Sequence, residues 1–295
     1  MAIPDRLPDF DELPVAAGAP PRSAWWLFGR EDQVGMFNLQ TPERIAAAAR
    51  LVQKGAMFPL NWELELPDPP LYSRGAVRHT IFANPYGHDD ALDNFYPQAS
   101  SQWDTLPHVG HPQHGFYNGV QREEITGKPG TRMGLENWAR RGIAGRAVLL
   151  DMARYLAEKG DPIDCATDRR FTVDELEACR KAHGVEIQTG DVLLIRTGWT
   201  DWYMTTDRMT RAALANTASL HAPGILAGEA MARYLWNLHI VAAASDCPSL
   251  EAWPPQRDTG GFLHQYLLAL FGIAIGELWD LGRLGEDCAA DGRYE

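Results

Sequence analysis

The run Asp191-Val-Leu-Leu-Ile-Arg-Thr197 indicates the fold class of this 295-residue chain. A short, almost uninterrupted apolar run is typical of a strand that is buried within a sheet. Arg146-Ala-Val-Leu-Leu-Asp151 and His239-Ile-Val-Ala-Ala-Ala-Ser245 repeat the pattern. Helices are predicted between these runs, at residues 172–184, which begin with a Thr-Val-Asp-Glu capping box, and at residues 229–238. Strands that alternate with helices predict an α/β fold.

The first part of the chain lacks this alternation. Residues 1–24 contain five prolines and cannot form a regular helix, so we expect an N-terminal arm that is either mobile or draped over a partner subunit. No later segment has the composition of a linker, so residues 25–295 are predicted to form a single domain. Thr41-Pro42 predicts the start of a helix that runs to Lys54 and ends at Gly55. Residues 57–119 are predicted to form short strands and long loops, where functional groups are often placed.

The composition is that of an ordinary globular protein, with 45% hydrophobic residues and a formal net charge of −12. This charge repels phosphate backbones and anionic lipids, which disfavours nucleic acids and membranes as partners. The most apolar run, residues 266–275, is about half of the roughly 20 residues that a membrane-spanning helix needs. The four cysteines are scattered, and the N-terminus has no secretion signal. We therefore expect a soluble, cytoplasmic protein with reduced thiols.

The stretch Gln98-Ala-Ser-Ser-Gln102-Trp-Asp104-Thr-Leu-Pro-His108 carries the strongest candidate for a chemical site. Asp104 and His108 are separated by an even number of residues in a segment rich in turn residues, so both side chains can face one site. Downstream, His264 precedes Glu277, which lies in an apolar stretch where an unpaired carboxylate is costly to bury. Two carboxylates and two imidazoles brought together suit a divalent cation and a water molecule to be activated.

Simpler interpretations of these residues stay open. Asp104 and His108 are also compatible with a surface pair or with a hydrogen bond inside a loop. Glu277 could instead pair with an arginine such as Arg196. In that case Asp104 and Glu277 would be members of buried ion pairs and would have only a structural role.

His111 and His114 continue the three-residue spacing that begins at His108. The glycines and the proline around them argue against a helix in this segment. We therefore expect these imidazoles at the rim of the pocket, in loop hydrogen bonds, or as substitute metal ligands. Trp103 and Leu106 are expected to supply the apolar wall that small-molecule pockets usually have.

This stretch resembles the signature of the metal-dependent cyclase family, which includes kynurenine formamidase and isatin hydrolase. The signature is His-x-Gly-Thr-His-x-Asp-x-Pro-x-His. Alignment on Asp104 places its last histidine at His108 and its other two at Gln98 and Gln102, and the Ser-Gln-Trp-Asp form resembles a longer subgroup of the family. Further similar text covers most of the chain: Asp32-Gln-Val-Gly-Met-Phe-Asn38-Leu-Gln-Thr-Pro-Glu43, Gly190-Asp-Val-Leu-Leu-Ile-Arg-Thr-Gly198, His221-Ala-Pro-Gly224 and Ser245-Asp246-Cys-Pro-Ser249.

The resemblance implies an α/β fold built as a swivelling β/β/α sandwich and assembled as a homodimer or homotetramer. It implies metal ligands at Asp104, His264 and Glu277 with Gln102 close by, and an acid/base role for His108. In binuclear relatives the downstream histidine binds a second metal ion and the following glutamate bridges both ions. An amide is a weaker ligand than an imidazole, so we expect one ion per chain. The oxygen-rich ligand set favours Mn²⁺, whereas the general affinity order favours Zn²⁺.

The resemblance also implies a substrate pocket. His221 and Asp246 match family text and are expected to line this pocket. Trp25 and Trp26 lie in the region where a family tryptophan stacks on an aromatic substrate. Gln98 is expected near the metal or the pocket because it replaces a family histidine.

The expected function is that of a metal-dependent hydrolase that cleaves a small amide, lactam or ester, with His108, His264 and Glu277 in the catalytic site. Two other functions stay open. A metal-polarised carbonyl also acidifies the adjacent carbon, which would allow a lyase or cyclase reaction. Alternatively, the changes at Gln98 and Gln102 leave a non-catalytic small-molecule-binding protein with a degraded metal site. The same two changes argue against kynurenine formamidase activity itself.

Overall fold

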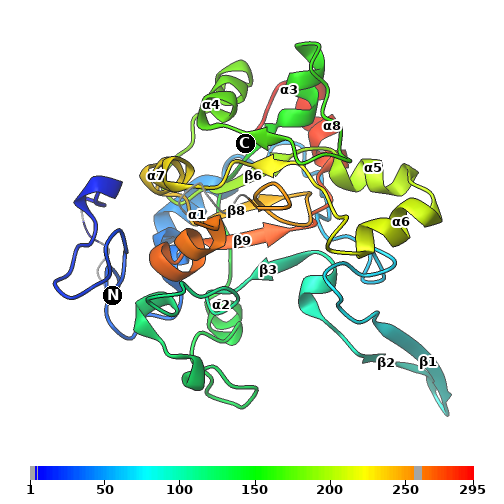
Figure 1. Ribbon diagram of the computed structural model, residues 1–295, viewed down its shortest axis with the longest axis horizontal. Coiled ribbons are helices and arrows are strands. Elements are labelled where there is room, and N and C mark those ends of the chain that lie inside the picture. Colours follow the sequence, from blue (N-terminus) through cyan, green and yellow to red (C-terminus); the bar gives the residue numbers. More distant parts are fainter. Residues whose placement is uncertain (1–3, 5, 256–260) are drawn as a thin grey trace.

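The computed structural model describes residues 4, 6–255 and 261–295, and a five-stranded sheet lies at its centre (Figure 1). The strand order is β3-β9-β8-β6-β4, with the bounds Gln102–Asp104 (β3), Ala147–Asp151 (β4), Val192–Arg196 (β6), Ala242–Ser245 (β8) and Ala274–Glu277 (β9). Strands β4, β6, β8 and β9 run parallel, and β3 lies antiparallel to β9 at the edge. The three apolar runs expected to be buried strands form β4, β6 and β8, which confirms the α/β prediction.

Helices connect the parallel strands and surround the sheet (Figure 1). They are α1 (Pro42–Ala49), α2 (Glu136–Arg141), α3 (Met152–Glu158), α4 (Val173–Ala182), α5 (Trp199–Thr205), α6 (Arg208–Ala215), α7 (Glu229–Asn237) and α8 (Gly282–Asp291). Short 3₁₀ turns are η1 (Phe10–Glu12), η2 (Gly35–Leu39), η3 (Pro97–Ala99), η4 (Tyr117–Gly119) and η5 (Arg122–Glu124), and η6 (Gln265–Phe271) is a π-helix. Two smaller sheets pair β1 (Arg78–Asn84) with β2 (Gly87–Asp93) and β5 (Arg170–Phe171) with β7 (Gly224–Ile225).

The predicted helices at residues 172–184 and 229–238 are α4 and α7. Helix α4 begins at the capping box, in which the Thr172 hydroxyl accepts a hydrogen bond from the Glu175 backbone. It ends just before Gly184, whose positive φ of 66° terminates helices at little cost. Local sequence signals therefore determine both ends of this helix.

Helix α1 is shorter than expected. It begins at Pro42 after the Thr41 cap but ends at Ala49, whereas the sequence predicted a helix that extends to Lys54. Lys54 forms ion pairs with Asp287 and Asp291 of α8, at 2.9 and 2.8 Å. No residue of α1 is buried, so little packing energy favours extending the helix against this tertiary contact.

The N-terminal arm lies on its own chain (Figure 1). Phe10 is fully buried, and its ring packs edge-on against Phe271 of the π-helix at 6.1 Å. Trp236 and Asn237 of α7 bind the backbone of Pro8 and Phe10 at 2.8 Å each. The described part of the arm is therefore docked on its own chain and is not mobile, because this chain itself offers an apolar site for Phe10. Residues 1–3 and 5 of the predicted arm lie outside the described residues.

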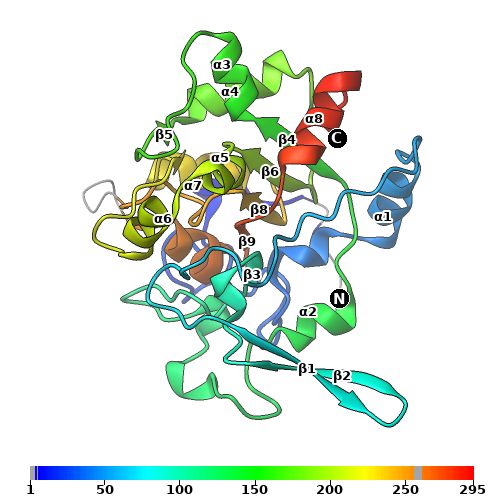
Figure 2. The ribbon, with the colours of Figure 1, turned by 90° about the vertical axis from the view of Figure 1, so that its right-hand side faces the viewer.

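Residues 57–119 contain the β1–β2 hairpin, which extends away from the main sheet (Figures 1 and 2). Strand β3 follows it, and long loops fill the rest of this region, as the sequence predicted. The apolar run at residues 266–275 folds as most of the π-helix and the start of β9. Within the part of the chain that the structure describes, no helix has the length and apolar character needed to cross a bilayer. All four cysteines are free and buried.

Several polar residues stand at the carboxyl ends of the parallel strands. Glu277 is the last residue of β9, and Ser245 is the last residue of β8. In open α/β sheets, ligands bind outside the carboxyl ends of the strands. A ligand site is therefore expected at the end of β9, beside the short edge strand β3.

Candidate metal centre

Strand β3 places two polar side chains on the same face of the sheet edge. Gln102 and Asp104 are buried and alternate with Trp103, whose ring packs edge-on against Trp279 at 4.7 Å. In the antiparallel register Gln102 lies opposite Glu277. Residues directly opposite one another share one face of a sheet, so their side chains meet. Accordingly, Gln102 Nε2 donates a hydrogen bond to Glu277 Oε2 over 2.9 Å.

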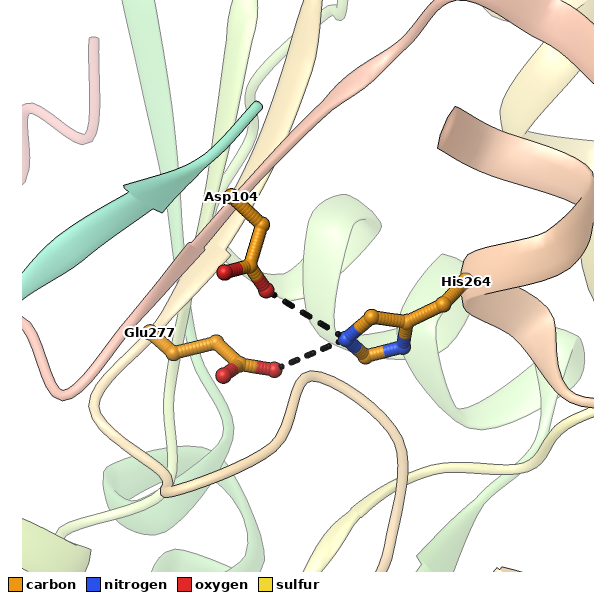
Figure 3. A group of neighbouring side chains, drawn as sticks. All are labelled: Asp104, His264 and Glu277. Carbon is orange, nitrogen blue, oxygen red and sulfur yellow. Dashed lines mark ion pairs between the residues drawn. The ribbon is translucent and has the colours of Figure 1, made fainter. Parts of the chain in front are cut away.

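His264 reaches the same point from the start of the π-helix (Figure 3). Its Nε2 lies 3.1 Å from Glu277 Oε1 and 3.5 Å from Asp104 Oδ2. Figure 3 shows both carboxylates pointing at this nitrogen, one from β9 and the other from β3. Asp104 is 0% exposed, His264 3% and Glu277 4%, so solvent cannot compensate their charges. The structure thus brings together three residues that are far apart in the sequence.

A further carboxylate that the sequence interpretation missed belongs to this cluster. Glu251 is fully buried, and its Oε1 accepts a hydrogen bond of 2.8 Å from Nδ1 of His264. That bond holds a proton on Nδ1 and leaves Nε2 facing Asp104 and Glu277. The neighbouring backbone N–H of Leu250 donates to Glu277 Oε1 over 3.0 Å. The segment around Glu251 therefore orients two members of the cluster.

The cluster carries an excess of buried negative charge. Asp104, Glu251 and Glu277 surround one imidazole, and no Lys or Arg among the described residues forms an ion pair with any of them. Burial lowers the pKa of His264, but the three carboxylates, led by Glu251, outweigh burial and raise it well above its usual value. Burial and the charge of Asp104 raise the pKa of Glu277 to about 7. In the absence of another cation, the cluster therefore retains protons to limit its charge.

The donor atoms fit a divalent cation. Both carboxylate oxygens of Asp104 and the amide oxygen of Gln102 are buried without a hydrogen-bond partner, which is rare for buried polar atoms. One ligand atom from each of Asp104, His264 and Glu277 lies within 4.8 Å of the other two. Ligand atoms around a tetrahedral metal ion with bonds of roughly 2.1 Å are about 3.4 Å apart. The separations of 3.1 and 3.5 Å from His264 Nε2 are close to that spacing.

His108 stands at the more open side of the cluster. Its Nε2 is 3.5 Å from Asp104 Oδ1, and its side chain is 26% exposed, compared with 4% for the side chain of His264. Burial lowers the pKa of His108 below its usual value, against the opposing charge of Asp104. An imidazole that is neutral near pH 7 and reachable from solvent suits proton transfer beside a cation.

Three residues that the sequence predicted as possible metal ligands or pocket residues, His111, His114 and Gln98, are not part of this cluster. His111 and His114 stack on each other, with ring centroids 4.5 Å apart, in a turn closed by backbone hydrogen bonds between His111 and Gly115. Among the described residues, the group that could hold a metal ion contains neither of them. Gln98 lies in η3, where its backbone carbonyl accepts a hydrogen bond from Arg74.

The aromatic residues expected near the substrate have varied surroundings. Trp25 is buried, and its indole donates to the backbone carbonyl of Ala269 over 2.7 Å. Trp26 is half-buried beneath the guanidinium of Arg30 at 3.7 Å. Trp103 points to the face of β3 opposite Asp104, and His221 is exposed. None of these side chains forms a hydrogen bond or ion pair with Asp104, His264 or Glu277.

Two further residues have structural partners. Both oxygens of Asp246 are occupied: Oδ1 accepts from the backbone and hydroxyl of Thr197 at 2.8 Å, and Oδ2 accepts from the backbone of Gly198 at 2.7 Å. Asp246 thus fixes the turn after β6. Arg196 pairs with Asp151 and with Asp201, at 3.0 and 2.7 Å. The alternative in which Arg196 neutralises Glu277 is therefore wrong.

Among solved structures, one described as a cyclase shares this architecture. No curated protein sequence matches the chain. A solved structure described as a novel cyclase is 30% identical, with a TM-score of 0.80 over 92% of this chain and 91% of that chain. Isatin hydrolase A from Labrenzia aggregata, bound to benzyl benzoate, is 15% identical, with a TM-score of 0.49 over 77% of this chain and 81% of that chain. Isatin hydrolase A from Ralstonia solanacearum is 18% identical, with a TM-score of 0.49 over 81% and 85%.

The sequence model of the family described as "Putative cyclase" matches residues 60–252 of this chain. The match covers well over half of the chain, and it contains β3 and the parallel strands β4, β6 and β8. The cyclase structure supports the same assignment, since it aligns along nearly the whole chain at 30% identity. The protein is therefore a member of the cyclase family.

Proposed function

We propose that this protein is a metal-dependent hydrolase that cleaves a small amide, lactam or ester. The observation that carries the proposal is Asp104, a fully buried carboxylate with no hydrogen bond to either oxygen, which faces His264 Nε2 beside Glu277. A divalent metal ion, when bound, polarises a carbonyl group and lowers the pKa of a water molecule from near 16 toward roughly 7. Membership of the cyclase family supports a metal-dependent hydrolase over a purely structural role for these buried charges.

Asp104, His264 and Glu277 are the proposed ligands. Gln102 contributes its unpartnered amide oxygen, because its Nε2 is already engaged with Glu277. Three oxygen donors and one nitrogen donor favour Mn²⁺, although the general affinity order favours Zn²⁺. We propose one ion per chain.

Glu251 is the proposed positioning residue for His264. By accepting the Nδ1 proton over 2.8 Å, it directs the Nε2 lone pair toward Asp104 and Glu277. The backbone N–H of Leu250 and the amide of Gln102 restrain the two oxygens of Glu277. The ligands are thereby held in place before an ion arrives, which reduces the entropy lost on binding.

His108 is the proposed acid/base group. Its Nε2 faces Oδ1 of Asp104 over 3.5 Å, whereas Nε2 of His264 faces Oδ2 of the same carboxylate over 3.5 Å. As a neutral base, His108 accepts a proton from the attacking water and returns it to the departing nitrogen or oxygen. Proton transfer of this kind typically contributes 10²- to 10⁴-fold to the rate, so roughly that loss is expected without the imidazole.

The test is a screen of amides, lactams and lactones with the metal-loaded wild type, His108→Ala and His111→Ala. The wild type should release the free acid, His108→Ala should lose turnover at unchanged metal content, and His111→Ala should remain active. His111 is a matched control because its imidazole lies in the same loop region but outside the cluster. Full activity of His108→Ala would remove His108 from the mechanism. A dehydrated or cyclised product without hydrolysis would favour a lyase or cyclase reaction instead.

A further inference from the structure

Arg74, near the candidate metal centre, forms no ion pair with any carboxylate among the residues that the structure describes. Arg74 is half-buried and follows a tight turn in which its backbone N–H donates to the carbonyl of Leu71 over 3.1 Å. The two residues before it, Tyr72 and Ser73, both adopt positive φ angles, 57° and 58°. This conformation is unfavourable for residues other than glycine, and such strain clusters at ligand sites. The surrounding structure therefore holds Arg74 in a defined position.

The turn packs onto the segment that orients the metal ligands. The guanidinium of Arg74 lies over the Tyr72 ring, 4.9 Å from its centroid. Tyr72 in turn packs edge-on against Trp253 at 5.0 Å and donates its hydroxyl to the carbonyl of Pro248 over 3.3 Å. Pro248 and Trp253 flank Glu251, which holds His264. Arg74 is thus linked to the cluster through a short series of direct contacts.

Electrostatic effects agree with this placement. Burial raises the pKa of Tyr72 well above its usual value, the charge of Glu277 adds to that effect, and the charge of Arg74 opposes it. Arg74 also contributes to the lowered pKa of His108, after the larger effect of burial. The guanidinium therefore lies within electrostatic reach of Tyr72 and of the acid/base histidine.

Among the described residues, Arg74 finds partners for few of its N–H donors. Its hydrogen-bond partner among the described residues is one neutral group, the backbone carbonyl of Gln98, and it forms no ion pair there. Arg146 and Arg180 behave differently, because each binds a carboxylate of this chain, at 2.6 and 2.9 Å. An arginine is always charged and presents a planar set of donors that matches a carboxylate in two places. Its natural ligand at this position is an anion from outside the chain.

We propose that Arg74 binds a carboxylate group of the substrate, so that the substrate is an amide, lactam or ester that also carries a carboxylate. This inference rests on the proposed hydrolase function, since it places the cleaved carbonyl at the metal centre and the second acidic group at Arg74. Tyr72 and Trp253 connect the guanidinium of Arg74 to the segment that holds His264. The indole Nε1 of Trp253 is buried without a hydrogen-bond partner and is a further donor beside Tyr72.

The test compares two amides that differ only in the carboxylate, hippurate and N-methylbenzamide. Binding to metal-loaded wild type, Arg74→Gln and Arg78→Gln is measured by calorimetry. Arg78 is the control because it lies on the exposed β1 strand. The wild type and Arg78→Gln should prefer hippurate by roughly 10- to 100-fold, the usual contribution of a charged bidentate contact, and Arg74→Gln should lose this preference. Arg74→Lys should retain part of it, because the charge stays while the planar pair of donors is lost.

The other possible outcomes show which of the two proposals is wrong, the assignment of Arg74 or the hydrolase function. If the wild type has no preference for hippurate, or if Arg74→Gln keeps the preference with an unchanged melting temperature, the assignment of Arg74 is wrong and the hydrolase proposal stands. A preference that disappears on metal removal but survives in Arg74→Gln would assign the carboxylate to the metal and also overturn the inference. If no variant hydrolyses any amide but the preference depends on Arg74, the carboxylate site stands and the hydrolase proposal fails.

Discussion

Replacing Glu251 with glutamine tests how the protein prepares His264 for a metal ion. Glu251 Oε1 accepts the Nδ1 proton of His264 over 2.8 Å, and both side chains are buried. Glutamine keeps an acceptor oxygen at this position, so no buried donor loses its partner and the fold should survive. The substitution removes the negative charge that makes Nε2 a stronger ligand. Loss of such a supporting residue usually weakens metal binding 10- to 100-fold, which corresponds to about 1.4–2.7 kcal/mol.

The pH of the measurement decides how much of this loss is seen. Glu251 raises the pKa of His264, so at low pH a metal ion has to displace a proton that Glu251 also stabilises. Removing Glu251 weakens the hold of both the proton and the metal. The loss of affinity in Glu251→Gln should therefore be small at about pH 6, where His264 of the wild type carries a proton, and should grow toward its full value as the pH passes the raised pKa of His264.

The assay is competition for Mn²⁺ or Zn²⁺ against a chromophoric chelator, with Glu286→Gln as the control. Glu286 is an exposed carboxylate of α8, so its loss removes the same charge without touching the cluster. Thermal unfolding of the metal-free proteins should show that Glu251→Gln is at least as stable as the wild type, because one of three clustered carboxylates is gone. An affinity within about twofold of the wild type, at a pH above which the wild-type affinity no longer rises, would refute the positioning role of Glu251, since the expected loss is at least tenfold.

Three further predictions follow from the same structure. Metal affinity should rise as the pH increases from about 6 to about 8, because burial raises the pKa of Glu277 to about 7 and the ion binds the deprotonated form; a flat pH profile would contradict this assignment. Phe10→Ala should lose about 3–5 kcal/mol in urea unfolding, and a loss below about 1 kcal/mol would show that the arm is not docked. Burial raises the pKa of Asp246 to about 6, so ionisation of this group should destabilise the protein by roughly 3 kcal/mol as the pH rises from about 4 to about 6. In denaturation curves recorded across that range, Asp246→Asn should lack this loss of unfolding free energy. An identical pH dependence of stability in the two proteins would refute the raised pKa of Asp246.

The parts of the fold that the sequence predicted correctly are those with local or periodic causes. The buried strands β4, β6 and β8 are continuous apolar runs, and a run of that kind has few alternatives to a position inside a parallel sheet. Helix α4 carries its own start and stop signals. Helix α1 was predicted too long because its end depends on Lys54 binding α8, a contact between residues 233 positions apart. Such a contact leaves no local pattern.

In the candidate site, too, the residues that were predicted are residues with a local sequence signal. Asp104 stood out by its spacing to His108, and Glu277 stood out because a carboxylate in an apolar stretch needs a buried partner; the structure places both beside His264. Glu251 could have been found by the same argument, since it stands between Leu250 and Ala252. Arg74 has no comparable signal, because a charged residue in a loop is ordinary until the structure shows that none of the described carboxylates pairs with it.

Whether Asp104, His264 and Glu277 hold a metal ion is tested most directly by the metal content of the purified protein. It is measured by elemental analysis for the wild type and Glu277→Ala side by side. The wild type should contain about one Mn²⁺ or Zn²⁺ per chain and the variant clearly less, because Glu277 supplies one of the three ligand atoms that converge within 4.8 Å. A wild-type protein that holds no metal, even after incubation with Mn²⁺ or Zn²⁺, would contradict this expectation. So would a variant that binds the ion as well as the wild type does.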